Sequence, residues 1–224
     1  MSTSLYLLAA AALFASHAVP SWPGVRPALI ARMGRTGFVT LHSLLSLAAL
    51  ALFAHAYLAA EVGGWVFFPA EGAAKLVVAL MPAAVFLVVA RLMRRAGEPQ
   101  APRPPAGVFR ITRHPGSVGI LLWALLHLQA TGDVRRVILF ATMAAIALFA
   151  IAKNDWVLRR AATPEAAAYR AGTSIIPFAA ILAGRQRLAP GEIGWAPVLA
   201  ALATYAALLV AHPHVFGVDP LYWL

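Results

Sequence analysis

The chain has 224 residues, of which 62% are hydrophobic and only 12% are charged. A soluble domain carries about a quarter charged residues, so this composition excludes an ordinary soluble protein and indicates an integral membrane protein. The net charge of +10 is typical of cytoplasmic membrane loops, and no basic run is interleaved with aromatics, so no nucleic-acid partner is expected. The chain has no cysteine, which excludes disulfides, iron–sulfur clusters and thiolate haem ligands.

Six apolar runs predict membrane spans. A bilayer core about 30 Å thick needs roughly 20 helical residues, or about 17 at the short end. The first run lacks the basic start of a signal peptide, so we interpret it as a retained span. We therefore predict an all-α polytopic membrane bundle of about six transmembrane helices. The runs cover about 3–19, 38–60, 73–92, 115–131, 134–153 and 194–212.

The loops between these runs alternate in charge. Arginines gather in the first, third and fifth loops, whereas the second loop carries Glu61 and Glu71. By the positive-inside rule the three basic loops are cytoplasmic, and both termini lie outside. The third loop, rich in proline and glycine, is expected to be irregular. The fifth contains "TSIIPFAAILAG" from Thr173 to Gly184, which is too short to span and is expected to lie at the interface or to dip into the protein.

His127 lies inside the fourth apolar run. An ionisable group at that depth is a functional candidate that should face the bundle interior. Gly119, Trp123 and His127 are four residues apart and share one helix face. This stripe suits the docking of a flat ligand, and it equally suits helix packing.

The fourth run opens with Arg113, His114 and Pro115. Proline suits the first turn of a helix, and helix N-termini attract anions, so the corner could recognise a carboxylate or phosphate or simply anchor the helix. The predicted spans contain no acid. Histidines without acidic partners favour haem over a hard-metal site. No catalytic serine–histidine–acid arrangement is evident, so the catalytic residues stay unknown.

The segment "RHPGSVGILLWALLHLQATGD" resembles the NnrU family of bacterial membrane proteins. The resemblance extends in order to "LFASHAVPS", "LHSLLSLAALALFA", "TSIIPFAAILAGR" and "HPHVFGVDPL". Because it covers essentially the whole chain, it implies a single NnrU-like transmembrane domain over residues 1–224, in the bacterial inner membrane.

This resemblance implies a role in denitrification, in the handling of nitrite and nitric oxide. The family is also similar to 15-cis-zeta-carotene isomerase, a membrane enzyme that uses haem b to isomerise a double bond. Its haem ligands correspond here to His17 and His127. Trp123 and Gly119 would then line the haem face, and the Arg113–His114 corner could pair with a propionate. The isomerase has a cysteine at the position of Ala124, so a thiolate ligand switch is excluded here.

Depth in the membrane disagrees with that pair of ligands. His17 falls near the cytoplasmic end of its span, whereas His127 lies about 12 residues into the fourth span, or ~18 Å along a helix. Two axial nitrogens on one iron are only about 4 Å apart. His55 would agree better with His127 in depth, so we rank the ligand candidates as His127, His17 and His55.

A second, local resemblance is to membrane methyltransferases of the isoprenylcysteine and phospholipid type, which hold S-adenosylmethionine. The shared positions are Arg113, His114, Pro115 and Gly119. Their tyrosine is Ser117 here, and their acidic pair is replaced by Lys153-Asn154-Asp155.

Three functions stay open. The first is a haem-dependent isomerase or redox protein, acting on an apolar small molecule or with nitrogen-oxide pathway proteins. The others are a methyltransferase and a non-catalytic membrane accessory.

Overall fold

The computed structural model describes residues 2–93 and 104–222, and in these ranges every regular element is a helix. Six helices are long: α1 (Thr3–Ser21), α2 (Val25–Ala59), α3 (Ala73–Leu92), α4 (Pro115–Ala130), α5 (Val134–Arg160) and α9 (Trp195–Phe216). Four short elements lie between them: the 3-10 turn η1 (Gly107–Arg110), α6 (Pro164–Gly172), α7 (Ala179–Leu182) and α8 (Pro190–Ile193).

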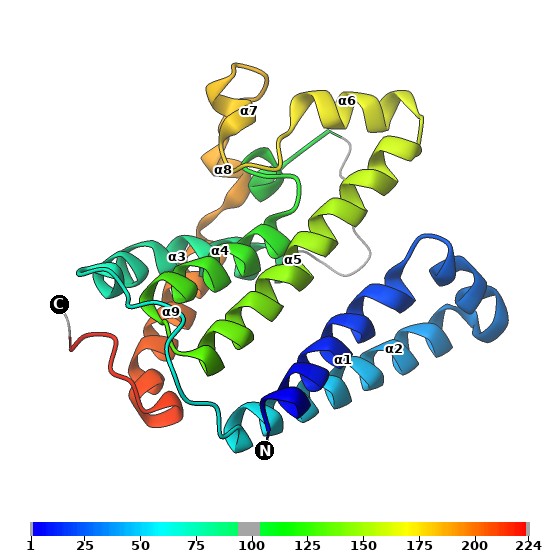
Figure 1. The fold of residues 1–224 in the computed structure, drawn as a ribbon. Helices are drawn as coiled ribbons and strands as arrows, with labels where there is room; N and C mark the ends of the chain where they lie inside the picture. The colour runs from blue at the N-terminus through cyan, green and yellow to red at the C-terminus, as the bar shows by residue number, and fades with distance from the viewer. Residues whose placement is uncertain (1, 94–103, 223–224) are drawn as a thin grey trace.

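Helices α1 and α2 form an antiparallel hairpin beside α5 (Figure 1). Tyr6 and Leu13 of α1 are buried against Phe53 and Ala56 of α2, and the rings of Tyr6 and Phe53 stack with centroids 5.4 Å apart. The Tyr6 hydroxyl donates a hydrogen bond of 3.0 Å to the backbone carbonyl of Arg135. This buried ring therefore fixes the hairpin to the start of α5.

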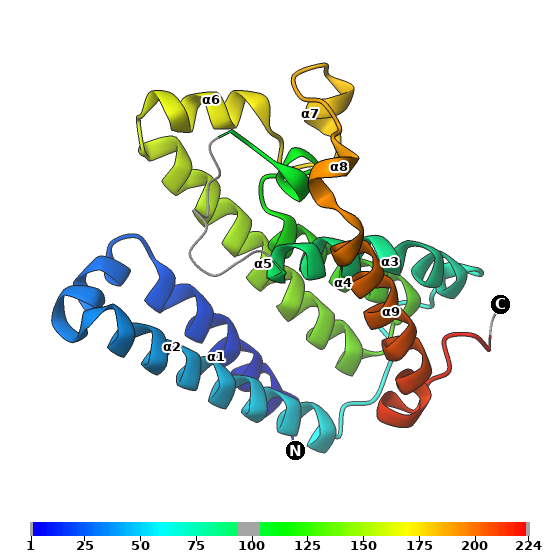
Figure 2. The same ribbon diagram turned by 180° about the vertical axis from the view of Figure 1, so that it is seen from behind.

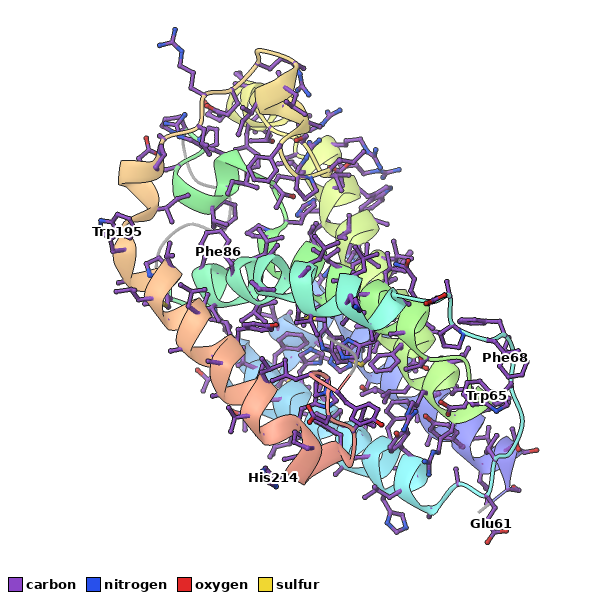
Figure 3. All side chains as sticks on the ribbon, turned by 90° about the vertical axis from the view of Figure 1, so that its left-hand side faces the viewer. Glu61, Trp65, Phe68, Phe86, Trp195 and His214 are labelled. Carbon is purple, nitrogen blue, oxygen red and sulfur yellow. The ribbon has the colours of Figure 1, made fainter. Side chains whose placement is uncertain are left out.

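Helices α3, α4 and α9 form the second part of the bundle (Figure 2). Helices α3 and α4 approach closely because Gly119 has no side chain: a Cβ there would lie 2.8 Å from the carbonyl oxygen of Ala84. On the other side of α3, the Tyr205 hydroxyl of α9 donates 2.9 Å to the carbonyl of Val78. Figure 3 shows α9 running along the bundle from Trp195 to His214.

The predicted membrane bundle is confirmed. Within residues 2–93 and 104–222, five helices are long and apolar enough to cross a membrane, namely α1, α2, α3, α5 and α9, and α4 is a shorter apolar helix. Many leucines on α2 are exposed, as suits a helix that contacts lipid. The start of α1 and the end of α9 lie at one end of the bundle, opposite α6, α7 and α8 (Figure 1). Which end faces the cytoplasm stays a prediction.

Three helices extend beyond the predicted apolar runs. Helix α2 begins at Val25 instead of residue 38 and is kinked at Gly34, where φ is +74°. Helix α5 continues past residue 153 to Arg160. The C-terminal helix α9 ends at Phe216, beyond residue 212. The added turns of α2 and α5 carry arginines, whose stems can lie along apolar surface while their charge reaches water. In the third loop, residues 94–103 lie outside the described residues.

The loop between α2 and α3 packs against the turn between α4 and α5 and is hydrogen-bonded to it. Trp65 pairs with Asp133 in an isolated bridge, and the Val66 amide donates 2.7 Å to the carbonyl of Gly132. A Cβ at Gly132 would lie 1.9 Å from the carbonyl oxygen of Phe67, so only glycine fits there. Trp65 and Phe68 stack at 5.3 Å and are seen on this loop in Figure 3.

Candidate functional site

The Arg113–His114 corner is built from two segments that are distant in sequence. The Arg113 amide donates 2.9 Å to the carbonyl of Ser174, and the Phe178 amide donates 2.9 Å to the carbonyl of Ile111. The buried Thr112 hydroxyl donates 2.6 Å to the carbonyl of Ile175. The first half of "TSIIPFAAILAG", which is irregular and turns at Pro177 and Phe178, thus fixes the start of α4, and α7 follows it.

Asp155 of α5 is the centre of this corner. Its carboxylate lies 3.4 Å from Nη1 of Arg113, 3.8 Å from Nε2 of His114 and 3.1 Å from Nη1 of Arg159. Asp155 is only 5% exposed. A buried carboxylate is stable only when it is paired, and here two arginines neutralise it. We call Arg113, His114 and Asp155, together with the exposed Arg159 beside them, the buried ionic corner.

The buried ionic corner is incompletely satisfied. Nε of Arg113, Nε2 of His114 and Oδ1 of Asp155 are all buried without a hydrogen-bond partner. Burial lowers the pKa of the His114 imidazole, against the opposing effect of Asp155. Burial likewise lowers the pKa of Arg113, and Asp155 again opposes the effect. His114 is therefore neutral at pH 7, and one further acceptor or a water could satisfy the free nitrogens.

Sequence analysis named Asp155 only as part of Lys153-Asn154-Asp155 and did not expect it at this corner. The predicted span 134–153 holds no acid, but helix α5 continues beyond it through Asp155 to Arg160. One signal could have found it: Asp155 and Arg159 are four residues apart, the spacing of a helical ion pair. Extending the helix by two turns would then have placed Asp155 close to the Arg113 corner.

The stripe of Gly119, Trp123 and His127 is occupied by protein side chains. Gly119 is covered by Val88 and Ala84 of α3, so it serves helix packing. Trp123 and His127 both contact Phe140 of α5, with the His127 and Phe140 rings stacked at a centroid distance of 4.6 Å. Nδ1 of His127 lies 2.9 Å from the carbonyl of Trp123. A proton on Nδ1 would fix the tautomer and leave Nε2 as the nitrogen that can bind a metal.

His17 has the same local arrangement on α1. Its Nδ1 lies 3.0 Å from the carbonyl of Leu13. Its ring neighbour is His42 of α2, with centroids 6.4 Å apart and planes at 71°. The other candidate on α2, His55, is exposed, whereas its neighbours Phe53 and Ala56 pack against α1. His55 therefore points away from the hairpin contact.

Contacts with α5 show how far along the bundle axis each candidate ligand lies. Phe14 of α1 and Trp22, which follows the end of α1, lie on either side of His17 in the sequence, and both contact Phe149. His127 contacts Phe140. Nine residues of α5 separate these phenylalanines, a rise of ~14 Å at about 1.5 Å per residue. The structure therefore does not bring His17 and His127 together, and it places His17 beside His42.

A hollow of about 660 Å³ opens between the start of α3 and α4. It is mostly apolar, but it lies on the face of α4 that carries Leu125 and Leu128 and not on the face of His127. The hollow and the His127 stripe are thus separate features. Its full lining comprises Phe67, Phe68, Ala70, Glu71, Gly72, Ala73, Leu76, Leu125, Leu128 and Gln129.

Two similar proteins are plant isomerases. The chain is 36% identical over 123 residues to the chloroplastic 15-cis-zeta-carotene isomerase of Arabidopsis thaliana, covering 52% of this chain and 33% of that protein. It is 35% identical over 82 residues to the Zea mays enzyme of the same name, covering 37% of this chain and 22% of that protein. The chain thus matches a third or less of the length of these relatives, and no solved structure matches it. Residues 6–220 match the NnrU protein family, so nearly the whole chain is accounted for and the protein belongs to the NnrU family.

Proposed function

We propose that the protein isomerises a double bond of an apolar polyene within the bilayer, using haem b held by histidines of the bundle. The observation that carries this proposal is the similarity to 15-cis-zeta-carotene isomerase over 52% of the chain. The helical membrane bundle is consistent with it, because a polyene dissolves in the apolar environment that these helices occupy. The mostly apolar hollow beside Phe67 and Leu125 would admit such a substrate.

Two histidines at separate positions along the bundle each have a ring nitrogen that can bind a haem iron. Nδ1 of His127 and of His17 each lies within hydrogen-bond distance of a backbone carbonyl, which would leave both Nε2 atoms free for a metal. The described residues hold no cluster of three or more His, Cys, Asp or Glu side chains for a hard-metal site. A bound haem would supply a redox centre next to the substrate. The chain's part is to hold that group and to exclude water from it.

The buried ionic corner has a different role in this proposal. Arg113 was expected to pair with an anion such as a haem propionate, but its guanidinium faces Asp155. The same contact argues against an S-adenosylmethionine site at this corner, because the charges of Arg113 and Asp155 largely neutralise one another. We propose that the corner mainly fixes the start of α4 to the end of α5. Its free nitrogens, Nε of Arg113 and Nε2 of His114, would accept only a small group or a water.

The test is an isomerisation assay on the full chain, purified in detergent from a haem-replete bacterial host. The protein is incubated with 15-cis-zeta-carotene, and the isomers are separated by chromatography. We expect conversion that depends on bound haem and is lost in His127→Ala but kept in His214→Ala, a histidine exposed on α9. Haem with nitric-oxide binding but no isomerisation would favour the denitrification role. A colourless protein that binds S-adenosylmethionine would favour methyl transfer, and one that binds neither would favour an accessory role.

A further inference from the structure

We propose that a hollow between the end of α5 and the start of α6 binds the headgroup phosphate of an anionic phospholipid, with Arg159 and Arg170 as its ligands. The hollow has a volume of about 280 Å³. It is lined by these two arginines and Thr163, together with apolar side chains that include Leu158 and Ala166, and we call it the arginine hollow. The inference is independent of the proposed function, because it involves none of the candidate haem ligands.

The polar groups of the arginine hollow suit a phosphate. A guanidinium can donate two parallel hydrogen bonds to phosphate oxygens, which makes arginine the preferred side chain for this anion. Thr163 caps α6 by accepting 3.2 Å from the Ala166 amide, so its hydroxyl proton can be donated to a further oxygen. Glu165, the acid in the first turn of α6, does not line the hollow. The hollow is smaller than the roughly 300–1,000 Å³ of a pocket for a drug-sized ligand, which fits one headgroup phosphate.

The charges beside the arginine hollow are unbalanced. Arg159 lies 3.1 Å from the carboxylate of Asp155, but that carboxylate also pairs with Arg113 at 3.4 Å. Arg170 and Arg185 lie close enough to act on the charge of Arg113, and neither pairs with a carboxylate in the part of the chain that the structure describes. A single carboxylate thus serves this group of arginines, and an anion from outside the chain would balance the excess.

The arginine hollow lies at the depth expected for lipid headgroups. Trp156 is exposed on α5, three residues after the predicted span ends at residue 153, and the Arg160 guanidinium lies 4.4 Å from the centre of its ring. Tryptophan is enriched where a helix leaves the hydrocarbon core, and an arginine stem reaches from there to the headgroups. The lining begins at Leu158, within one turn of this tryptophan. The phosphates nearest to the hollow are therefore those of the bilayer.

Exposed apolar side chains accompany these arginines. Ile176, Phe178 and Leu182 are exposed in the segment that follows α6 and forms α7, at the same end of the bundle as the arginine hollow (Figure 1). Apolar and basic side chains together are typical of segments that lie on an anionic bilayer surface. A free phosphate ion would use the arginines but leave these apolar side chains in water. A phospholipid accounts for both features.

The test measures lipid binding to the full-length protein by native mass spectrometry. Dioleoyl phosphatidylglycerol and dioleoyl phosphatidylcholine have the same acyl chains, so the ratio of their dissociation constants reports the charge of the headgroup. We expect the anionic lipid to bind more tightly, and Arg170→Gln and Arg159→Gln each to weaken its binding about fivefold. Arg170→Lys keeps the charge and should lose less than Arg170→Gln. Arg32→Gln, the same change at an exposed arginine of α2, should leave the affinity unchanged.

Thermal unfolding shows whether each variant is folded. Arg159→Gln removes a partner of Asp155, so a loss of lipid binding in that variant counts only if its melting temperature stays near that of the wild type. Arg170 has no such ion pair among the described residues. Arg170→Gln should therefore stay folded, and it decides the test if Arg159→Gln does not.

Three results would overturn the proposal. Equal affinities for the two lipids would mean that the charge of the headgroup is not recognised. An equal loss in Arg32→Gln and Arg170→Gln would mean that the arginines act as a diffuse basic surface and that the hollow is not a site. If inorganic phosphate displaces the lipid and binds as tightly in its absence, the ligand is the free ion. None of these results depends on bound haem, so the proposed function is tested separately.

Discussion

Arg113 and Asp155 are 42 positions apart in sequence, yet Nη1 of Arg113 lies 3.4 Å from Oδ1 of Asp155. The arginine precedes α4 and the aspartate lies in the last turns of α5. Their side chains are only 13% and 8% exposed. This contact therefore joins the two ends of the α4–α5 hairpin that lie away from its tight turn, and it places charge where few water molecules can reach it.

We expect Asp155→Asn to lower the free energy of unfolding by about 3–5 kcal/mol, the cost of breaking a buried ion pair from one side. The substitution keeps the size of the side chain but leaves the charge of Arg113 buried without a counter-ion. Unfolding of the detergent-solubilised protein by heat or denaturant measures the loss.

Asp133→Asn is the matched control. Asp133 caps α5 by accepting from the Arg136 amide, and it pairs with the Arg136 side chain at a site that is 23–34% exposed. Asparagine is an equally good cap, and exposed pairs contribute about 0–1 kcal/mol. If both variants lose stability equally, Asp155 has no special part in the corner.

The stability of the protein should fall in mild acid because of His114. Burial lowers the pKa of this histidine below its ordinary value of 6.5. Between the two pKa values the unfolded chain binds a proton that the folded protein does not, so acid favours unfolding. Stability should be complete above about pH 6.5, decline as the pH falls below it, and level off below the pKa of folded His114.

The measurement is the melting temperature of the wild type and of His114→Gln between pH 8 and pH 5. The variant cannot gain the proton, so its curve should be flatter in this window, whatever its stability at pH 8. His214→Gln, altered at an exposed histidine, should keep the wild-type slope. An unchanged slope in His114→Gln would show that His114 is not the titrating group.

The long helices could be predicted from the sequence because lipid selects apolar residues over the whole length of a span. The ends of α2 and α5 could not, because Arg26 and Asp155 lie in helical turns whose composition resembles a loop. The candidate ligands His17 and His127 were found as residue types at unusual depth. Their neighbours were not, since the contact of His17 with His42 depends on how α1 packs against α2. Periodicity along one helix carries no information about that packing.

Gly119→Ala should destabilise the bundle by about 1–3 kcal/mol, the usual cost of overpacking a core. A Cβ at this position would lie 2.7 Å from Cγ2 of Val88 and 2.8 Å from the carbonyl oxygen of Ala84, and the backbone of α3 can move only by repacking. Gly37→Ala is the control, since the nearest atom to its Cβ would be 3.5 Å away. That variant should be neutral or gain roughly 0.5–1 kcal/mol, because alanine favours helix over glycine. Equal effects in thermal unfolding would mean that α3 and α4 are not closely packed at Gly119.

The orientation of the bundle in the membrane can be measured by labelling single introduced cysteines, because the chain has no cysteine of its own. Glu71 lies in the acidic second loop and Arg187 in the basic fifth loop, and both are exposed. The positive-inside rule places the second loop outside and the fifth in the cytoplasm. We expect a membrane-impermeant maleimide to label Glu71→Cys in intact bacterial cells and to label Arg187→Cys only after the membrane is opened. The reverse pattern would invert the topology. It would also place the buried ionic corner, which is bonded to the same segment as Arg187 through Ser174, at the outer face, where its His114 would meet the pH of the surroundings.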